Sequence, residues 1–332
     1  MKALRLIVLL AFFGACQNEG EYQLDIPENV EPFLIPEDNK LSQAKVDLGR
    51  SLFYEKGLSL DSSVSCGSCH IQQFAFADTA RVSRGFQGDT GFRNSSSLTN
   101  VAFQTAFFRD GGVFSLERAV HPPVLGEFEM NMNLMDMLDR LNANPSYPQA
   151  FKNAFNSEID NKGIVQALAS FQRTLLSFNS PYDKFMAGDS LALKGSQKRG
   201  LQLFRSDRLN CAKCHAEPLF IDNKMHNIGL YESYREYGRG RVTLKEEDFG
   251  MFRTPTLRNI EVSFPYMHDG SIKTLEEVLE FYKTGGFHHP NKSVEMRSIE
   301  LTENEKADLI AFLHALTDNA FLTDSRFSSP KE

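Results

Sequence analysis

Two short stretches decide how this chain of 332 residues is built: Cys66-Gly-Ser-Cys69-His70 and Cys211-Ala-Lys-Cys214-His215. Together they hold four of its five cysteines. In Cys-x-x-Cys-His, two thiols reach the two vinyl groups of one porphyrin, and the next residue presents an imidazole to the iron. A zinc site or a redox-active cysteine pair does not need a histidine at that position. The two stretches therefore predict two covalent c-type haems.

The fifth cysteine follows an apolar N-terminal stretch. Residues 1–15 begin with Lys2 and Arg5, continue almost without polar side chains, and end directly before Cys16. This pattern is typical of an export signal and resembles that of a bacterial lipoprotein. The apolar run is shorter than a membrane span. We expect a signal peptide at 1–15, lipidation at Cys16, a tether at 16–35, and a lipid-anchored protein of the bacterial cell envelope that faces the periplasm. Ordinary secretion is the alternative.

Charge and length limit the class of protein further. The formal net charge is −7 at pH 7. A protein of this sign repels a phosphate backbone, so nucleic acid is not an expected partner. The length suits about two domains, each large enough to bury a core without disulfides.

A weak internal repeat precedes the two motifs. Gly49-Arg-Ser-Leu52-Phe53 leads into the first motif, and Gly200-Leu-Gln-Leu203-Phe204 leads into the second. A Gly-x-x-Leu-Phe segment before each haem motif indicates a duplicated unit. We therefore predict a mainly α fold of two haem domains related by duplication, at 36–180 and 181–325, with long irregular loops.

Hydrophobic periodicity supports this fold. Apolar residues follow helical spacing at 164–176 and at 309–316. Thr302 and Glu305 form a capping box before the second of these segments. The stretch 179–196 contains proline and glycine and is expected to connect the domains, whereas 229–250 is polar and is expected to be a loop.

Further stretches resemble segments of bacterial di-haem cytochrome c peroxidases and occur in the same order. This family includes peroxidases and the MauG type, which uses peroxide to oxidise a protein substrate. The resemblance covers roughly residues 36–318. The matching stretches are Arg93-Asn94-Ser95, Asp110-Gly111, Glu129-Met130-Asn131, Phe252-Arg253-Thr254-Pro255-Thr256-Leu257-Arg258-Asn259 and Pro265-Tyr266-Met267-His268-Asp269-Gly270.

The resemblance implies cytochrome c-like domains and a division of labour between two haems. The haem held by Cys66, Cys69 and His70 is expected to react with hydrogen peroxide. The haem held by the second motif, with His215 as its ligand, is expected to pass on electrons from a small donor such as a c-type cytochrome. A MauG-like oxidase that modifies a partner protein and a non-catalytic electron-transfer cytochrome remain as alternatives.

Glu129 aligns with the family's distal glutamate. A carboxylate above the iron can accept a proton from one peroxide oxygen and return it to the other. We therefore expect Glu129 to be the catalytic acid and base. Two alternatives stay open: Glu129 is an ordinary helix-start acid beside Glu127, or His121 of the same segment assists.

Two positions on the expected peroxide side depart from the family pattern. Phe86 stands where a histidine ligates the resting haem in peroxidases that need reductive activation, and phenylalanine cannot ligate iron. Ala119 stands where the family has a glutamine. The resemblance therefore implies an open sixth position at the first haem.

The second haem has two candidate sixth ligands. Tyr282 aligns with the methionine of peroxidases, and MauG-type enzymes have a tyrosine there. A phenolate stabilises oxidised iron better than a thioether does. Met267 is the second candidate, and its alternative is a core methionine beside Tyr266.

Two more positions concern the region between the haems. Arg109 stands where the family usually has a tryptophan, so an electron would need direct tunnelling or a neighbour such as Phe108. The resemblance also implies a calcium ion between the domains. Asn94 aligns with its side-chain ligand, and Ser263 and Pro265 align with residues that donate backbone oxygens. The alternative for Asn94 is a plain turn residue.

Overall fold

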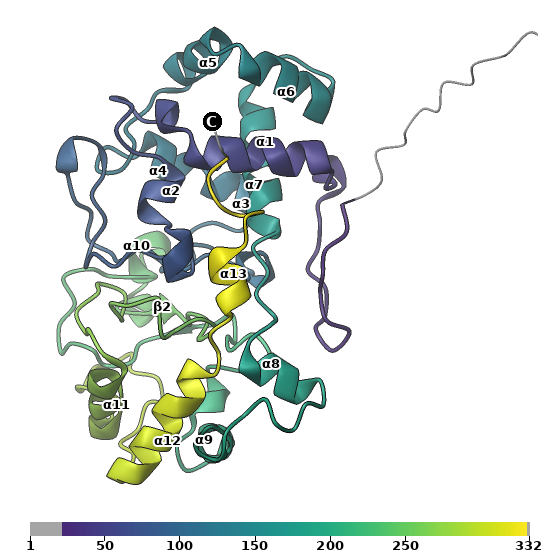
Figure 1. Cartoon of the computed structure of the whole chain (residues 1–332). Helices are drawn as coiled ribbons and strands as arrows, with labels where there is room; N and C mark the ends of the chain where they lie inside the picture. The colour runs from purple at the N-terminus through teal and green to yellow at the C-terminus, as the bar shows by residue number, and fades with distance from the viewer. Residues whose placement is uncertain (1–21, 331–332) are drawn as a thin grey trace, which may run out of the picture.

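The computed structural model describes residues 22–330, so the predicted signal peptide and Cys16 lie outside the described residues. The described part is mainly helical, which confirms the predicted class (Figure 1). Its strands are β1 (Met225–His226) and β2 (Phe252–Arg253), which pair antiparallel. The α-helices are α1 (Gln43–Tyr54), α2 (Cys66–Cys69), α3 (Leu116–Ala119), α4 (His121–Leu125), α5 (Leu134–Ala143), α6 (Ser146–Phe155), α7 (Asn161–Arg173), α8 (Pro181–Met186), α9 (Gly195–Arg205), α10 (Gly240–Thr243), α11 (Leu275–Thr284), α12 (Glu303–His314) and α13 (Asn319–Thr323).

Short 3₁₀ turns and long loops join these helices. The turns are Glu37–Asn39, Lys56–Leu58, Gln72–Phe74, Phe86–Gly88, Val101–Phe103, Cys211–Lys213 and Glu246–Asp248. The predicted connection at 179–196 contains α8 and the start of α9, and the predicted loop at 229–250 contains α10. Within residues 22–330, no helix combines the length and the apolar character that a bilayer span requires.

The apolar side chains gather in two main clusters. One is built from residues between Val46 and Leu175 together with Phe321, Leu322 and Phe327, and the other from residues between Tyr182 and Leu316. In Figure 1 they correspond to the upper group of helices around α1 and α7 and to the lower group around α9 and α12. The change between clusters falls near the predicted boundary at 180/181, and the division into two domains remains a prediction.

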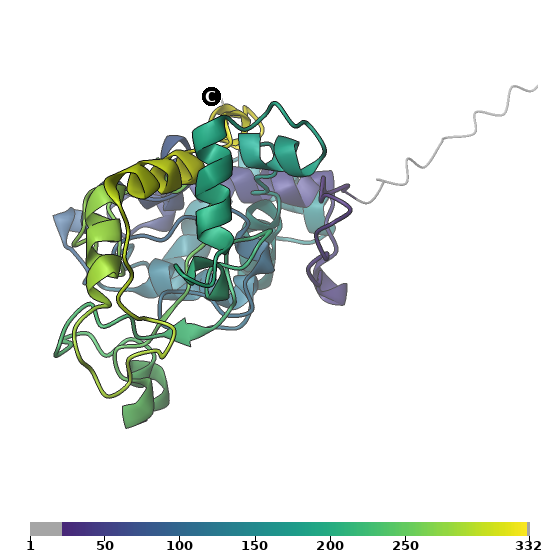
Figure 2. The same cartoon turned by 90° about the horizontal axis from the view of Figure 1, so that it is seen from below.

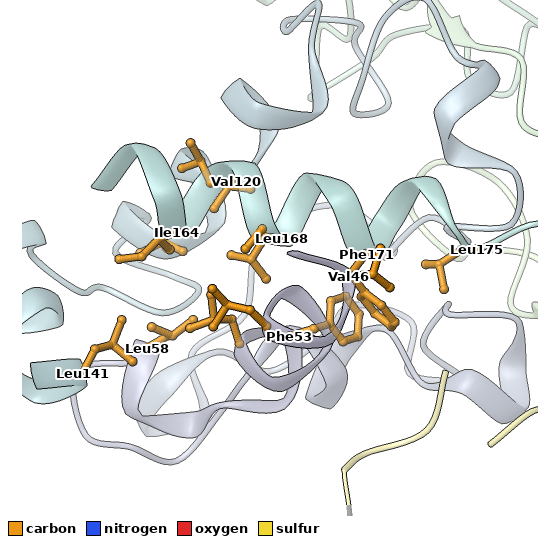
Figure 3. Packing of buried hydrophobic residues seen from close by; sticks show 14 of the residues in the cluster. Val46, Phe53, Leu58, Val120, Leu141, Ile164, Leu168, Phe171 and Leu175 are labelled. Atoms are coloured by element: carbon orange, nitrogen blue, oxygen red, sulfur yellow. The ribbon is translucent and has the colours of Figure 1, made fainter. Parts of the chain in front are cut away.

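The first cluster is organised by the close crossing of α1 and α7. A Cβ atom added to Gly49 on α1 would lie 1.9 Å from the carbonyl oxygen of Ala167 and 2.9 Å from Cβ of Phe171. Only glycine therefore lets the two backbones approach this closely. One turn later, the rings of Phe53 and Phe171 pack with centroids 5.2 Å apart, as Figure 3 shows. The crossing thus places Phe53 at the centre of the cluster, with 1% exposure.

The second cluster repeats this arrangement with α9 and α12, which Figure 2 shows side by side. A Cβ atom on Gly200 would lie 2.0 Å from the carbonyl oxygen of Asp308 and 2.7 Å from Cβ of Phe312. The rings of Phe204 and Phe312 pack 5.3 Å apart. The predicted capping box is confirmed, because Thr302 and Glu305 bond each other's backbone N–H groups at the start of α12.

The two ends of the described chain both pack on the first cluster. Phe321 and Phe327 belong to it although they follow the second cluster in sequence, and the hydroxyl of Tyr54 donates to the carbonyl of Phe327 at 2.7 Å. At the other end, Tyr22 packs against the same cluster. The ring of Phe33 packs on that of Phe103, with centroids 4.9 Å apart. Tyr22 and Phe33 of the predicted tether therefore pack on the folded part of the chain.

The crossing at Gly49 generates a stability prediction. Gly49→Ala should lower the free energy of unfolding by about 1–3 kcal/mol, because α1 must move away from Ala167 to admit the new methyl group. Gly195→Ala is the control, since the nearest atom to a Cβ there is 3.6 Å away. The measurement is thermal and denaturant unfolding of the haem-loaded proteins. Equal stability of the two variants would contradict this account of the crossing.

Candidate functional site

The first haem motif lies on α2, directly after the 3₁₀ turn and loop that follow α1. Ser65 and Ser68 form a capping box at the start of α2. Nδ1 of His70 lies 2.8 Å from the carbonyl oxygen of Phe76. A carbonyl only accepts, so Nδ1 carries the proton and Nε2 keeps its lone pair for a metal. Burial lowers the pKa of His70, so the imidazole is neutral at neutral pH.

The second motif has the same geometry. Nδ1 of His215 lies 3.2 Å from the carbonyl oxygen of Phe220. Phe76 and Phe220 are both fully buried and both have φ of +57°. Phe76 packs on Phe53 of α1, with ring centroids 5.9 Å apart, and Phe220 packs on Phe204 of α9 at 5.6 Å. Each helix crossing therefore positions a phenylalanine whose carbonyl orients a motif histidine.

The four motif thiols suit covalent attachment to a porphyrin. They form no disulfide with one another. Burial raises the pKa of Cys66 to about 12 and the pKa of Cys211 to about 11, so both are protonated at neutral pH. With one oriented histidine after each pair, the donor sets fit two c-type haems.

A mostly apolar cavity opens beside the second motif. Residues of both halves line it. They include the second motif itself, together with Asn94, Arg109, His226, Tyr234, Ser263, Pro265, Met267, His268, Tyr282 and Met296. The cavity therefore brings together both candidate ligands, Tyr282 and Met267, with the second motif.

Tyr282 lies in the last turn of α11. Thr274 caps the start of this helix in a capping box with Glu277, and Gly285 ends it at φ +76°. Burial raises the pKa of Tyr282, and the nearby thiols of Cys211 and Cys214 raise it further. The phenol thus faces the second motif as a neutral group, and a cation in the cavity would favour its ionised form.

Met267 faces the same cavity from a strained position. Its φ is +74°, and the matching residue of the first half is Phe108, with φ +64°. Each is followed, after one intervening residue, by an Asp-Gly pair: Asp110-Gly111 in the first half and Asp269-Gly270 in the second. The equivalent turns close with Phe107 bonded to Val113 and Tyr266 bonded to Ile272. Met267 therefore occupies a duplicated turn whose counterpart carries no ligand atom.

Glu129 lies beside the first motif. Its N–H donates to the carbonyl of Gly126 at 3.0 Å within a tight turn. Its carboxyl group contributes to the raised pKa of both Cys66 and Cys69, which places the charge near both thiols. The side chain remains accessible to solvent, yet desolvation by the surrounding protein raises the pKa of Glu129, and Arg93 partly opposes this shift.

Phe86 lies against the Glu129 segment. Its N–H donates to the carbonyl of Glu129 at 2.7 Å, and its side chain is 6% exposed. A Cβ on the neighbouring Gly85 would lie 2.2 Å from the carbonyl of Phe128, so the two loops pack directly. Phe86, which is expected to leave the sixth position of the iron open, and Glu129, the expected acid, therefore lie on the same side of the first motif.

Three further residues lie near this segment: His121, Ala119 and Arg93. Nε2 of His121, on α4, lies 3.1 Å from Oδ1 of Asn161 at the start of α7. Ala119 ends α3. Sequence reasoning missed Arg93, whose guanidinium pairs with Asp110 at 2.7 Å and with Glu236 at 2.8 Å. Arg93 belongs to the Arg93-Asn94-Ser95 stretch that resembles the family, but the sequence does not indicate that Glu236 lies beside it.

The side-chain oxygen of the expected calcium site is already bonded to a cationic side chain. Oδ1 of Asn94 accepts a hydrogen bond from Nη2 of Arg109 at 2.8 Å. Burial, together with Arg253 and Arg93, lowers the pKa of Arg109 to about 9, so the guanidinium is still charged at neutral pH. Ser263 and Pro265 line the cavity with Arg109. The calcium expectation disagrees with these contacts.

Comparison with known proteins identifies the family. Residues 43–191 match the model described as di-haem cytochrome c peroxidase. The chain is 39% identical over 288 residues to the methylamine utilization protein MauG of Methylorubrum extorquens. This match covers 85% of this chain and 80% of that protein. It is 36% identical over 341 residues to the cytochrome-c peroxidase IdrP1 of Pseudomonas sp. (strain SCT), which covers 93% of this chain and 89% of that protein.

A solved structure agrees with this assignment. The crystal structure of a MauG-like protein associated with microbial copper homeostasis matches with a TM-score of 0.88 and 34% identity, over 93% of this chain and 99% of that chain. The di-haem peroxidase BthA of Burkholderia thailandensis matches with a TM-score of 0.76 at 22% identity, a likeness of fold. With two oriented Cys-x-x-Cys-His sites on such a fold, the chain belongs to the di-haem cytochrome c peroxidase family, which includes MauG.

Proposed function

We propose that the chain reduces hydrogen peroxide to water with electrons from a small redox protein such as a c-type cytochrome. The observation that carries this proposal is the carboxyl group of Glu129 beside the first motif, with Phe86 rather than a ligating side chain in the adjoining loop. Relatives named cytochrome-c peroxidase support it. The overall reaction consumes one peroxide, two electrons and two protons and yields two waters.

In this proposal, two histidines hold the haems and one carboxylate moves the proton. His70 would hold the first haem through Nε2, and His215 would hold the second. The haems supply the electron-transfer chemistry when bound. A carboxylate oxygen of Glu129 accepts the proton of the nearer peroxide oxygen and returns it to the departing oxygen. Its raised pKa brings it closer to neutral pH, where a carboxyl group performs both steps better.

Tyr282 supports a second candidate function. It faces the second motif across the cavity, and its phenolate would favour the oxidised state of a haem there. A haem with such a ligand suits a MauG-like oxidase that modifies a partner protein. The relatives named MauG also support this candidate. A non-catalytic electron-transfer cytochrome is less consistent with Glu129 beside the first motif.

We also place the protein in the bacterial cell envelope, facing the periplasm and anchored by lipid at Cys16. The support is the sequence of residues 1–16 and the attachment of c-type haem outside the cytoplasm. No calcium is assigned to this function.

Glu129→Gln should keep both haems and lose about 10²- to 10⁴-fold in peroxide turnover, because the amide cannot accept the proton. Activity of the unsubstituted protein should fall as pH drops through the pKa of Glu129, which lies above the usual 4.5, because protonation removes the base. Glu127→Gln, two residues away, is the control. Stopped-flow spectra with reduced cytochrome c provide the measurement. Equal rates for the two variants would assign the proton transfer elsewhere.

Phe86→His should make the oxidised protein depend on prior reduction, because the new imidazole can occupy the open position at the first haem. Phe86→Leu is the matched control, since leucine cannot ligate iron. The absorption and magnetic spectra of the resting protein, recorded before peroxide is added, report the coordination. If the unsubstituted protein already requires prior reduction, another residue occupies that position and the proposed role of Phe86 is wrong.

Tyr282→Phe should change the resonance Raman and magnetic spectra of the second haem, because it removes the phenolate oxygen. Tyr282→Met should raise the potential of that haem, since a thioether stabilises oxidised iron less well. Met267→Leu is the comparison, because Met267 lines the same cavity. Spectra that change with Met267→Leu and not with Tyr282→Phe would assign the ligand to Met267.

A further inference from the structure

The polar groups of Asn94 are all engaged by protein atoms. Its Oδ1 accepts from Nη2 of Arg109 at 2.8 Å, and its carbonyl oxygen accepts from Nε of the same guanidinium at 3.4 Å. Its Nδ2 donates to the carbonyl of Ala80 at 3.2 Å, and its N–H donates to the carbonyl of His268 at 2.9 Å. A calcium ligand must offer an oxygen at about 2.3–2.6 Å from the ion. The oxygen that would do so already binds a cation.

The charges around Arg109 also disfavour a divalent ion. Two further arginines lie close enough to act on its guanidinium, namely Arg93 and the buried Arg253. The carboxylates of Asp110 and Glu236 are both paired with Arg93. Calcium prefers carboxylate oxygens, and here the nearby ones already neutralise a guanidinium. An added double positive charge would face repulsion from three arginines in a partly buried site.

The third carboxylate of this region is engaged as well. Asp269 accepts from the hydroxyl of Tyr231 at 2.7 Å and pairs with Arg81 at 3.3 Å. It raises the pKa of Arg109 through its charge alone, because no hydrogen bond joins the two among the described contacts. Asp269 therefore partly offsets the repulsion of Arg109 by the other arginines, and its carboxylate is not free for calcium.

Arg109 connects the two halves of the chain. Its side chain holds the Asn94 segment, and its carbonyl oxygen accepts from the N–H of Arg253 on β2 at 2.8 Å. Asn94 in turn donates to His268 of the second half. A guanidinium is planar and has five N–H donors, so it bonds to acceptors in fixed directions, whereas a spherical ion has no preferred direction of its own. The guanidinium thus holds the Asn94 segment within the first half, and the backbone groups of Arg109 and Asn94 reach Arg253 and His268 of the second half.

We propose that Arg109 replaces the interdomain calcium ion, so that its guanidinium is the resident cation bound by Asn94 and the chain needs no calcium. The substitution explains why one position both lacks the family's tryptophan and contacts the expected calcium ligand. This inference does not depend on the proposed peroxidase reaction.

The test compares three proteins carrying both haems: the unsubstituted chain, Arg109→Gln and Arg241→Gln. Arg241 is an exposed arginine on α10, so its loss changes the net charge equally. Calcium content is measured by elemental mass spectrometry after gel filtration in calcium-free buffer. Unfolding midpoints are then recorded with calcium chloride and with the chelator EGTA, because a ligand that binds only the folded state raises its midpoint.

The proposal predicts that the unsubstituted protein holds no stoichiometric calcium and unfolds at the same temperature with calcium and with EGTA. It also predicts a lower midpoint for Arg109→Gln than for Arg241→Gln. One calcium per chain in the unsubstituted protein, or a midpoint that falls on adding EGTA, would overturn it. Equal midpoints for the two variants would also overturn it. If Arg109→Gln does not fold, the measurements on the unsubstituted protein decide alone.

Discussion

The orientation of each motif histidine depends on a helix crossing that only glycine permits. At Gly49 the backbone of α1 approaches the carbonyl of Ala167 so closely that no side chain fits. That approach brings Phe53 against Phe171, and Phe76 packs on the resulting face. The carbonyl of Phe76 then orients His70. A contact without any chemistry of its own thus controls the direction in which Nε2 of the imidazole points.

The second half repeats this sequence of contacts through Gly200, Phe204, Phe220 and His215. The repetition explains why a weak pattern of glycine and phenylalanine recurs before both motifs. Helix packing conserves the motif geometry while the loops around it differ. The first loop carries Glu129, whereas the second half places Tyr282 near its thiols. One scaffold can therefore offer an acid to one haem and a phenol to the other.

Charged groups join the two halves in addition to the apolar contacts of Phe321 and Phe327. Arg93 bridges Asp110 of the first half to Glu236 of the second. Arg258 is 1% exposed, pairs with Asp183 of its own half at 2.9 Å, and donates to the carbonyl of Ser177 in the first half at 3.0 Å. Removing one partner of such a buried pair leaves an uncompensated charge, which typically costs about 3–5 kcal/mol. Arg93 and Arg258 therefore each bond groups of both halves.

The relatives of this chain carry two kinds of name, peroxidase and MauG, at similar identity. Family membership therefore does not choose between the two reactions. We expect a few side chains to decide the chemistry: Phe86 beside the acid, Tyr282 at the second motif, and Arg109 beside Asn94. In the proposed functions, each of them affects a ligand, a charge or an oxidisable group.

Short-range patterns in the sequence were sufficient to predict the haem motifs, the mainly helical class and the capping box of α12. Each of these depends on residues within a few positions of one another, so the spacing of side chains along the chain contains the information. The close helix crossings also left a signal, because only glycine tolerates them. Lipidation at Cys16 remains a sequence prediction.

Tertiary structure alone decided which distant groups meet. The pairing of Arg93 with Glu236 and the return of Phe327 to the first cluster join residues far apart in the chain, and the bond between Arg109 and Asn94 joins residues 15 positions apart. Asn94 illustrates the reason. Its identity was compatible with a calcium ligand, but whether its oxygen is free depends on which side chain the fold places beside it. The sequence determined the available donors and acceptors, and packing determined their partners.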